Sequence, residues 1–278
     1  MADTLLITEA LIRDTFREAM ARKIFWGLFA LSTLMILFFL FLLKIDIVEG
    51  AMATVSLFGQ TNDREIDVNK LVRQAHAGIA AFLYTWGMFL AVFASAGLVP
   101  SLLEPGRIEL LLSKPVGRTH LLLGRYLGNL LVVSLNTAYL VIGVWLIFGF
   151  KTGIWRPAFL VAIASTIFLF AVLLCVVVLV GVAFESTALA VMVAAGLMIV
   201  SPILAQSKIV TRLLSSEWSR QLWNAIYQIL PKVYDLGKMT LDYIVRDKVD
   251  SFMPVLTSGL FGAAALIGAI VIFRRRDF

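Results

Sequence analysis

Six long apolar stretches constrain this chain more than any other feature. Each has about 20 or more residues with almost no charge, which is the length of helix that crosses a hydrocarbon core of about 30 Å. Hydrophobic residues make up 60% of the chain and charged residues 15%, whereas a soluble domain is about half apolar and a quarter charged. The sequence therefore predicts an all-α membrane protein with six transmembrane helices, at residues 24–43, 78–99, 121–150, 157–184, 186–206 and 254–273.

The fourth and fifth stretches are separated by one charged residue. Between Pro157 and Gln206 the only charge is Glu185, and an unbroken helix of that length would reach about 75 Å, more than twice the thickness of a membrane. The chain must therefore turn, and we expect the turn at Glu185 and the polar residues that follow it. Six spans then place both ends of the chain on one side.

The placement of Lys and Arg sets the expected orientation. The Lys and Arg residues are divided almost evenly between the two sides of the membrane. Basic residues that directly flank a span carry most weight in setting the orientation. These are Arg22 with Lys23, and the run from Arg274 to Arg276. We expect a multi-pass protein of the cell inner (cytoplasmic) membrane with both termini cytoplasmic.

The segments outside the spans have their own patterns within a single transmembrane domain, residues 1–278. Residues 1–23 show a period near four that predicts an amphipathic helix in the headgroup plane; a helix packed on a partner protein is the alternative. Two long outer loops, 44–77 and 207–253, are expected to be helical. The second contains apolar residues at three-to-four spacing that stop at Pro231, which predicts an amphipathic helix on the outer surface.

Several kinds of chemistry are missing from the sequence. The net charge of +6 and pI near 9.6 are explained by basic flanks that face anionic lipid, so we expect lipid as a partner and no nucleic acid. Cys175 is the only cysteine, and no metal-ligand spacing occurs. The stretch Gly237–Thr240 lacks the first glycine and the hydroxyl of a phosphate-binding loop. We expect no catalytic residue, metal or cofactor in this chain.

Polar side chains inside spans are costly unless they pair or line a wet path. Asn136 and Thr137 in the third span, and Tyr84 and Thr85 in the second, are the candidates for such a path. Asn136 lies deepest, although a hydrogen bond between helices explains it better. Since no acid or base falls in the middle of a span, lipidic, peptidic or other amphipathic cargo fits better than a strongly charged one.

A polar stretch, residues 102–131, interrupts the apolar chain between the second and third spans. Pro105 suits the first turn of a helix, while Pro115 and Gly117 prevent its continuation. This predicts a short amphipathic cytoplasmic helix tied closely to two spans. Such a helix can transmit force from a partner, and a plain interfacial turn is the alternative. Its apolar stripe is Ile108, Leu111 and Leu112, and its charged side chains are Glu104, Arg107 and Lys114.

The same stretch carries a resemblance to a known family. EPGRIELLLSKPVGR, residues 104–118, followed by LLLGRYLG, resembles the first cytoplasmic loop of type-2 ABC exporter permeases. It is most similar to the branch associated with multicopper-enzyme maturation. The C-terminal FRRRDF and the order of segments along the whole chain also resemble that family. Arg125 departs from the pattern, because Lys is commoner there, but it keeps the charge.

The resemblance implies a coupling helix that docks on a separate ATPase subunit, with Glu185 as a second, smaller contact. Two ATPase subunits would bind ATP and Mg, and a second copy of this chain or a related permease would complete the path. The chain itself would be no enzyme. The alternative is an ATP-driven scaffold that acts on an extracytoplasmic partner protein without moving a substrate. The implied contacts on the loop are Glu104, Arg107, Ile108, Glu109, Leu112, Lys114 and Arg118.

Overall fold

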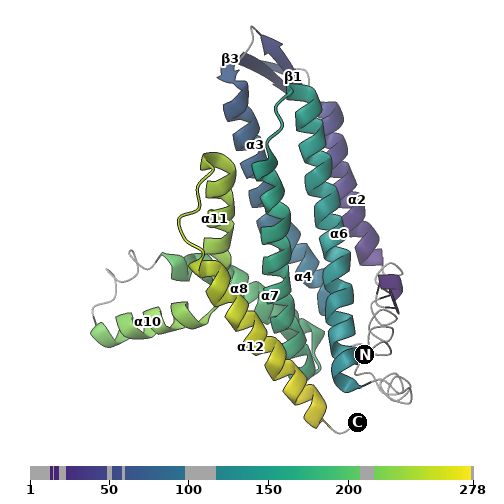
Figure 1. Ribbon diagram of the computed structural model, residues 1–278, viewed down its shortest axis with the longest axis vertical. Helices are drawn as coiled ribbons and strands as arrows, with labels where there is room; N and C mark the ends of the chain where they lie inside the picture. Colours follow the sequence, from purple (N-terminus) through teal and green to yellow (C-terminus); the bar gives the residue numbers. More distant parts are fainter. Residues whose placement is uncertain are drawn as a thin grey trace.

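The computed structural model describes residues 13–14, 16–18, 23–48, 52–57, 60–97, 117–206 and 216–276. Within these residues, long apolar helices run side by side and a small sheet caps one end (Figure 1). The elements are α2 (Lys23–Leu37), η1 (Phe38–Leu42), β1 (Leu43–Val48), β2 (Met52–Leu57), β3 (Gln60–Asp67), α3 (Val68–Phe82), η3 (Leu83–Gly87), α4 (Met88–Ala96), α6 (Arg118–Thr152), η5 (Pro157–Leu160), α7 (Val161–Phe184), α8 (Thr187–Ala205), α10 (Glu217–Ile229), α11 (Val233–Arg246) and α12 (Met253–Arg275).

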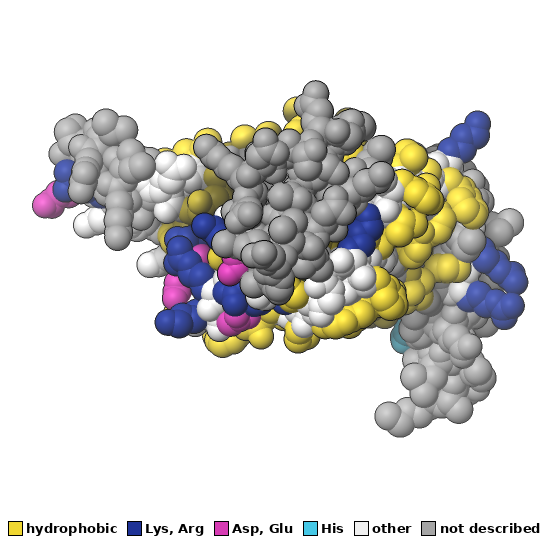
Figure 2. Space-filling model, turned by 90° about the horizontal axis from the view of Figure 1, so that it is seen from above, with side chains coloured by type: hydrophobic (Ala, Val, Ile, Leu, Met, Phe, Trp, Pro, Cys, Tyr) yellow, Lys and Arg dark blue, Asp and Glu magenta, His cyan; other side chains and the backbone are white. Residues whose placement is uncertain are grey.

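The predicted helical membrane fold is confirmed. Large hydrophobic side chains are exposed along the flanks of the bundle (Figure 2), as expected for helices that face lipid rather than water. A shorter apolar helix, Phe25–Phe41, lies where the first span was expected. Five helical stretches of the described chain are long and apolar enough to cross a membrane: Val68–Ala96, Arg118–Thr152, Pro157–Phe184, Thr187–Ala205 and Met253–Arg275.

The helix at the second predicted span begins at Val68, well before the expected start at residue 78. The side chain of Asp67 caps the helix, since its carboxylate accepts hydrogen bonds from the amides of Asn69 at 2.7 Å and Lys70 at 3.3 Å. The first turns of α3 are too polar to be recognised as part of an apolar span. They nevertheless bury one face of the helix, which includes Val72 and Ile79. Packing of that face therefore extends the helix beyond its hydrophobic part.

The first outer loop contains a sheet within residues 43–67, which corrects the expectation that the loop 44–77 is helical. Strands β1, β2 and β3 are antiparallel and lie in that order. Polar and apolar residues alternate in Lys44-Ile45-Asp46-Ile47 and again in Thr54-Val55-Ser56. A period of two indicates β-strands. The expectation of a helical loop overlooked this period because the flanking spans are helical.

Helix α7 lies at the centre of the bundle. It packs against α4, α6, α8 and α12, and every side chain from Val172 to Val178 is buried. Helix α12 approaches it closely at Gly262, where an added Cβ would lie 3.4 Å from the Cα of Val172. Other helices rather than lipid therefore cover most sides of this apolar helix, and α7 forms the core of the bundle.

The second outer loop forms two helices. Helix α10 ends just before Pro231, as the sequence predicts, and none of its residues is buried. Helix α11 instead packs against α3, α7, α8 and α12. Figure 1 shows α10 extending sideways from the bundle while α11 lies along it. The outer loop therefore adds one docked helix and one exposed helix to the spans.

Candidate functional site

The described residues place two of the eight side chains that the resemblance assigns to the ATPase contact. Arg118 begins α6, and Glu185 lies in the turn between α7 and α8. The other six, on the predicted coupling helix, lie outside the described residues: Glu104, Arg107, Ile108, Glu109, Leu112 and Lys114.

Arg118 and Glu185 are brought together by Arg276, at the end of α12. One guanidinium nitrogen of Arg118 donates to the carbonyl of Arg276 and, at 3.3 Å, to the carbonyl of Arg274. Arg276 in turn pairs with the carboxylate of Glu185. We call this set of contacts the basal junction. It joins the beginning of α6, the α7–α8 turn and the end of α12.

Local backbone geometry explains why the junction forms at Glu185. This residue ends α7 in the left-handed conformation, with φ of 52°, and its amide donates to the carbonyl of Gly181. Arg276 also donates to the carbonyl of Val182 in the last turn of α7. Carbonyls at a helix C-terminus are left without intrahelical partners and carry partial negative charge, so a guanidinium is favourable there.

A second ion pair ties the N-terminal region to α6. Arg125 is only 3% exposed, and its guanidinium contacts Glu18 and, at 3.5 Å, Asp14. A buried guanidinium without such partners would be strongly unfavourable. The two acids are four residues apart, on one face of a helix. The described part of residues 1–23 is helical, and it lies at the same end of α6 as the basal junction.

The four candidate path residues lie in two separate cavities. Asn136 and Thr137 border a cavity of about 50 Å³ between α2, α4 and α6, which has room for a few water molecules. The side-chain oxygen of Asn136 is buried and has no partner among the described residues, so it can accept a hydrogen bond from such a water. Tyr84 and Thr85 border a much larger cavity.

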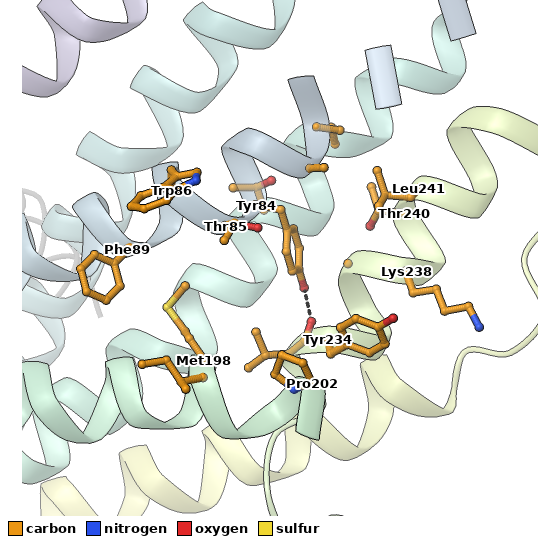
Figure 3. Close-up of a pocket in the computed structure, with 17 residues that line it drawn as sticks. Tyr84, Thr85, Trp86, Phe89, Met198, Pro202, Tyr234, Lys238, Thr240 and Leu241 are labelled. Carbon is orange, nitrogen blue, oxygen red and sulfur yellow. Dashed lines mark hydrogen bonds between the residues drawn. The ribbon is translucent and has the colours of Figure 1, made fainter. Parts of the chain in front are cut away.

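This larger cavity, which we call the α8–α11 cavity, has a volume of about 460 Å³. Its walls come from α3, η3, α4, α7, the second half of α8 and residues 233–241 of α11. The lining is mainly aromatic and aliphatic, including Trp86, Phe89, Met198 and Tyr234 (Figure 3). The volume falls within the range of about 300–1,000 Å³ typical of small-molecule sites.

Tyr84 holds one wall of the cavity to the other. Its hydroxyl donates to the carbonyl of Val233 at 2.9 Å, which connects η3 with the first turn of α11 (Figure 3). Gly237 allows this approach, since an added Cβ would lie 2.7 Å from the Tyr84 ring. The π-helical turn at η3 widens the helix where these side chains emerge, and such turns are frequent at functional sites.

The α8 wall is interrupted by a proline. Pro202 lies inside α8 and has no amide hydrogen, so the carbonyl of Met198 loses its usual partner four residues on. Both residues line the cavity. The hydroxyl of Thr240 is already used, because it donates to the carbonyl of Leu236 at 2.9 Å. The cavity therefore offers a large apolar surface and few polar contacts.

Two serines that sequence reasoning missed fix α11 in position. The hydroxyl of Ser258, on α12, accepts from the amide of Lys232 at 2.9 Å, and that of Ser201, on α8, accepts from the amide of Tyr234 at 2.9 Å. Both serines are buried. Their only signal in the sequence is a lone hydroxyl near the end of an apolar run, which does not reveal a partner far along the chain.

Comparison with known proteins gives one family. The family model described as "ABC-2 family transporter protein" matches residues 10–278. None of the curated proteins matches the chain.

Proposed function

Because the chain belongs to the ABC-2 family of transporter proteins, we propose that it is the transmembrane subunit of an ATP-driven exporter whose ATPase is a separate polypeptide. The family match carries this proposal, since it runs from residue 10 to residue 278 and so includes every span. In this proposal two ATPase subunits bind ATP and Mg and drive a pair of permeases, formed by two copies of this chain or by this chain and a relative.

The basal junction supports a role in coupling. Arg118 is the last residue of the predicted coupling helix, residues 104–118. It is hydrogen bonded to the end of α12, which is paired through Arg276 with the α7–α8 turn. A push on the coupling helix would therefore reach α6, α7, α8 and α12 together. Stiff helices joined by short contacts transmit such a displacement, whereas a flexible loop would absorb it.

The orientation and the finer family branch are also part of the proposal. The basic clusters beside the spans and the coupling motif favour the inner membrane, with the basal junction on the cytoplasmic side. The motif at residues 104–118 supports the branch associated with multicopper-enzyme maturation. The apolar lining of the α8–α11 cavity favours export of an amphipathic substrate.

Co-purification with a co-expressed ABC ATPase subunit tests the proposal. The double charge reversal Glu104→Arg and Arg107→Glu should abolish stable association, because both side chains belong to the predicted docking face. Glu217→Lys, on the exposed helix α10, is a matched control that should leave association unchanged. Association that survives the double reversal would exclude this docking site.

A further inference from the structure

We propose that the α8–α11 cavity is a binding site for one amphiphile that has an apolar chain and a head group with both a cationic and an anionic group. The proposal concerns binding alone, so it goes beyond the proposed function and holds whether or not an ATPase drives the chain.

The cavity opens on both apolar and polar surroundings. Trp86 and Ile199 line it from helices long enough to cross a membrane, and these side chains are 61% and 63% exposed. Tyr234 and Lys238 line it from α11, which has a polar face. An apolar chain can therefore enter from the lipid side while a polar group stays beside α11.

A second hollow adjoins the cavity at Lys238. This hollow, the polar basin, has a volume of about 290 Å³, and Lys238 lines both spaces. Figure 3 shows the Lys238 amine directed away from the aromatic side chains of the cavity. Long basic side chains commonly bury the stem along apolar surface and keep the charge in water. Lys238 therefore marks the border between an apolar space and a charged one.

The charges of the polar basin point to a head group of mixed sign. Asp235 accepts a hydrogen bond from the hydroxyl of Tyr227 at 2.6 Å, and Lys232 lies 4.6 Å from the centre of the Tyr227 ring. Asp242 is 3.9 Å from a guanidinium nitrogen of Arg246.

The hydrogen bond to Asp235 and the ring contact of Lys232 leave both charges in place. The basin is therefore bordered by two basic side chains, Lys232 and Lys238, and three acidic ones, Asp235, Asp242 and Asp250. Lys238 and Asp250 border the basin, and neither forms an ion pair with another described residue. Lys238 can hold a phosphate or carboxylate, and Asp250 can hold an ammonium group. A zwitterionic head group satisfies both, whereas a singly charged one satisfies one of them and meets a like charge at the other.

The test uses the full chain, purified without any ATPase, and three amphiphiles with the same saturated chain. Lysophosphatidylethanolamine is the zwitterionic probe, hexadecyl phosphate the anionic one and hexadecyltrimethylammonium the cationic one. Native mass spectrometry measures the dissociation constants. The zwitterionic probe should bind about threefold to tenfold more tightly than the other two, because each exposed ionic contact contributes modestly.

Variants locate the binding site. Lys238→Glu should weaken binding of the zwitterionic and anionic probes by about threefold to tenfold and strengthen binding of the cationic probe. The matched control Lys248→Glu, beyond the end of α11, should leave the affinity for all three probes unchanged. Thr85→Trp, at an exposed wall position, should weaken all three by filling the cavity. A probe with a brominated chain should quench the fluorescence of Trp86, so quenching should be smaller in Trp86→Phe. Equal affinity for the three probes, equal effects of the two lysine variants, or undiminished binding to Thr85→Trp would each overturn the proposal.

Discussion

At Gly237 the backbone of α11 lies directly against the ring of Tyr84. Gly237→Ala would place a methyl group 2.7 Å from that ring, and the ring is held by its hydrogen bond to Val233. We expect a loss of about 1–3 kcal/mol in unfolding free energy, measured by thermal unfolding in detergent. The control is Gly196→Ala in α8, where nothing lies within 4 Å of an added Cβ. It should gain up to about 1 kcal/mol from helix propensity, and equal effects at the two glycines would contradict the close contact.

The Tyr227 hydroxyl donates to Asp235 at 2.6 Å. Burial raises the pKa of Tyr227 above its ordinary value near 10, and the hydrogen bond to Asp235 and its negative charge raise the pKa further. The folded state thus favours the neutral phenol. Its stabilisation is fully present below about pH 10 and is lost as pH rises through the folded-state pKa.

Tyr227→Phe tests this pH dependence. It should cost about 1 kcal/mol of unfolding free energy near neutral pH, because one hydrogen bond is lost. Above about pH 10 the difference from the unaltered protein should shrink, since Tyr227 then ionises in the unfolded state. Thermal unfolding over a pH series measures the difference. A difference that grows with pH would show that the neutral phenol is not the favoured form.

At the scale of the element, α11 depends on hydroxyls supplied by two other helices. The amides of the first turn of a helix have no partner within the helix, and Ser258 and Ser201 accept from those of Lys232 and Tyr234. In Ser201→Ala with Ser258→Ala, two amides lose their acceptors, at a cost of about 1–3 kcal/mol each where they stay buried.

Hydrogen exchange measures the effect of this double substitution. Residues 232–246 should exchange faster, while the centre of α7 should keep its protection, because opening of α11 is local. Ser219→Ala is the control, since that hydroxyl donates to the carbonyl of Ser216 beside α10 and not to another of the described helices. Unchanged exchange in α11 would mean that packing alone holds this helix.

The elements differ in how far the sequence predicts them. The spans and the turn at Glu185 follow from the length and polarity of single segments, so local reasoning finds them. The start of α3 at Val68 does not, because its polar first turns become helical only by packing. Tyr84 and Thr85 were expected beside a path and do line a cavity, but its opposite wall lies on α11. There Gly237 and Lys238 stood out only as parts of an incomplete phosphate-binding loop, since contacts between distant segments are absent from local patterns.

At the scale of the whole molecule, the basal junction joins three parts of the chain through few contacts. Glu185 and Arg276 are both partly exposed, so their pair contributes at most about 1 kcal/mol to stability. Its effect on coupling should be larger, because the Arg276 side chain joins the end of α12 to Glu185 and to the carbonyl of Val182 at the end of α7. Arg276→Glu should therefore leave thermal unfolding nearly unchanged but lower the ATPase activity of a complex reconstituted with the partner ATPase.

The exchanged pair Glu185→Arg with Arg276→Glu distinguishes coupling from stability. If the ion pair transmits movement, exchanging its charges should restore much of the ATPase activity that the single reversal loses, since opposite charges again face each other across the junction. Binding of the ATPase, measured by co-purification, should be similar in all forms if the coupling helix supplies the main docking surface. An exchanged pair as inactive as Arg276→Glu would show that the junction does not act through this ion pair.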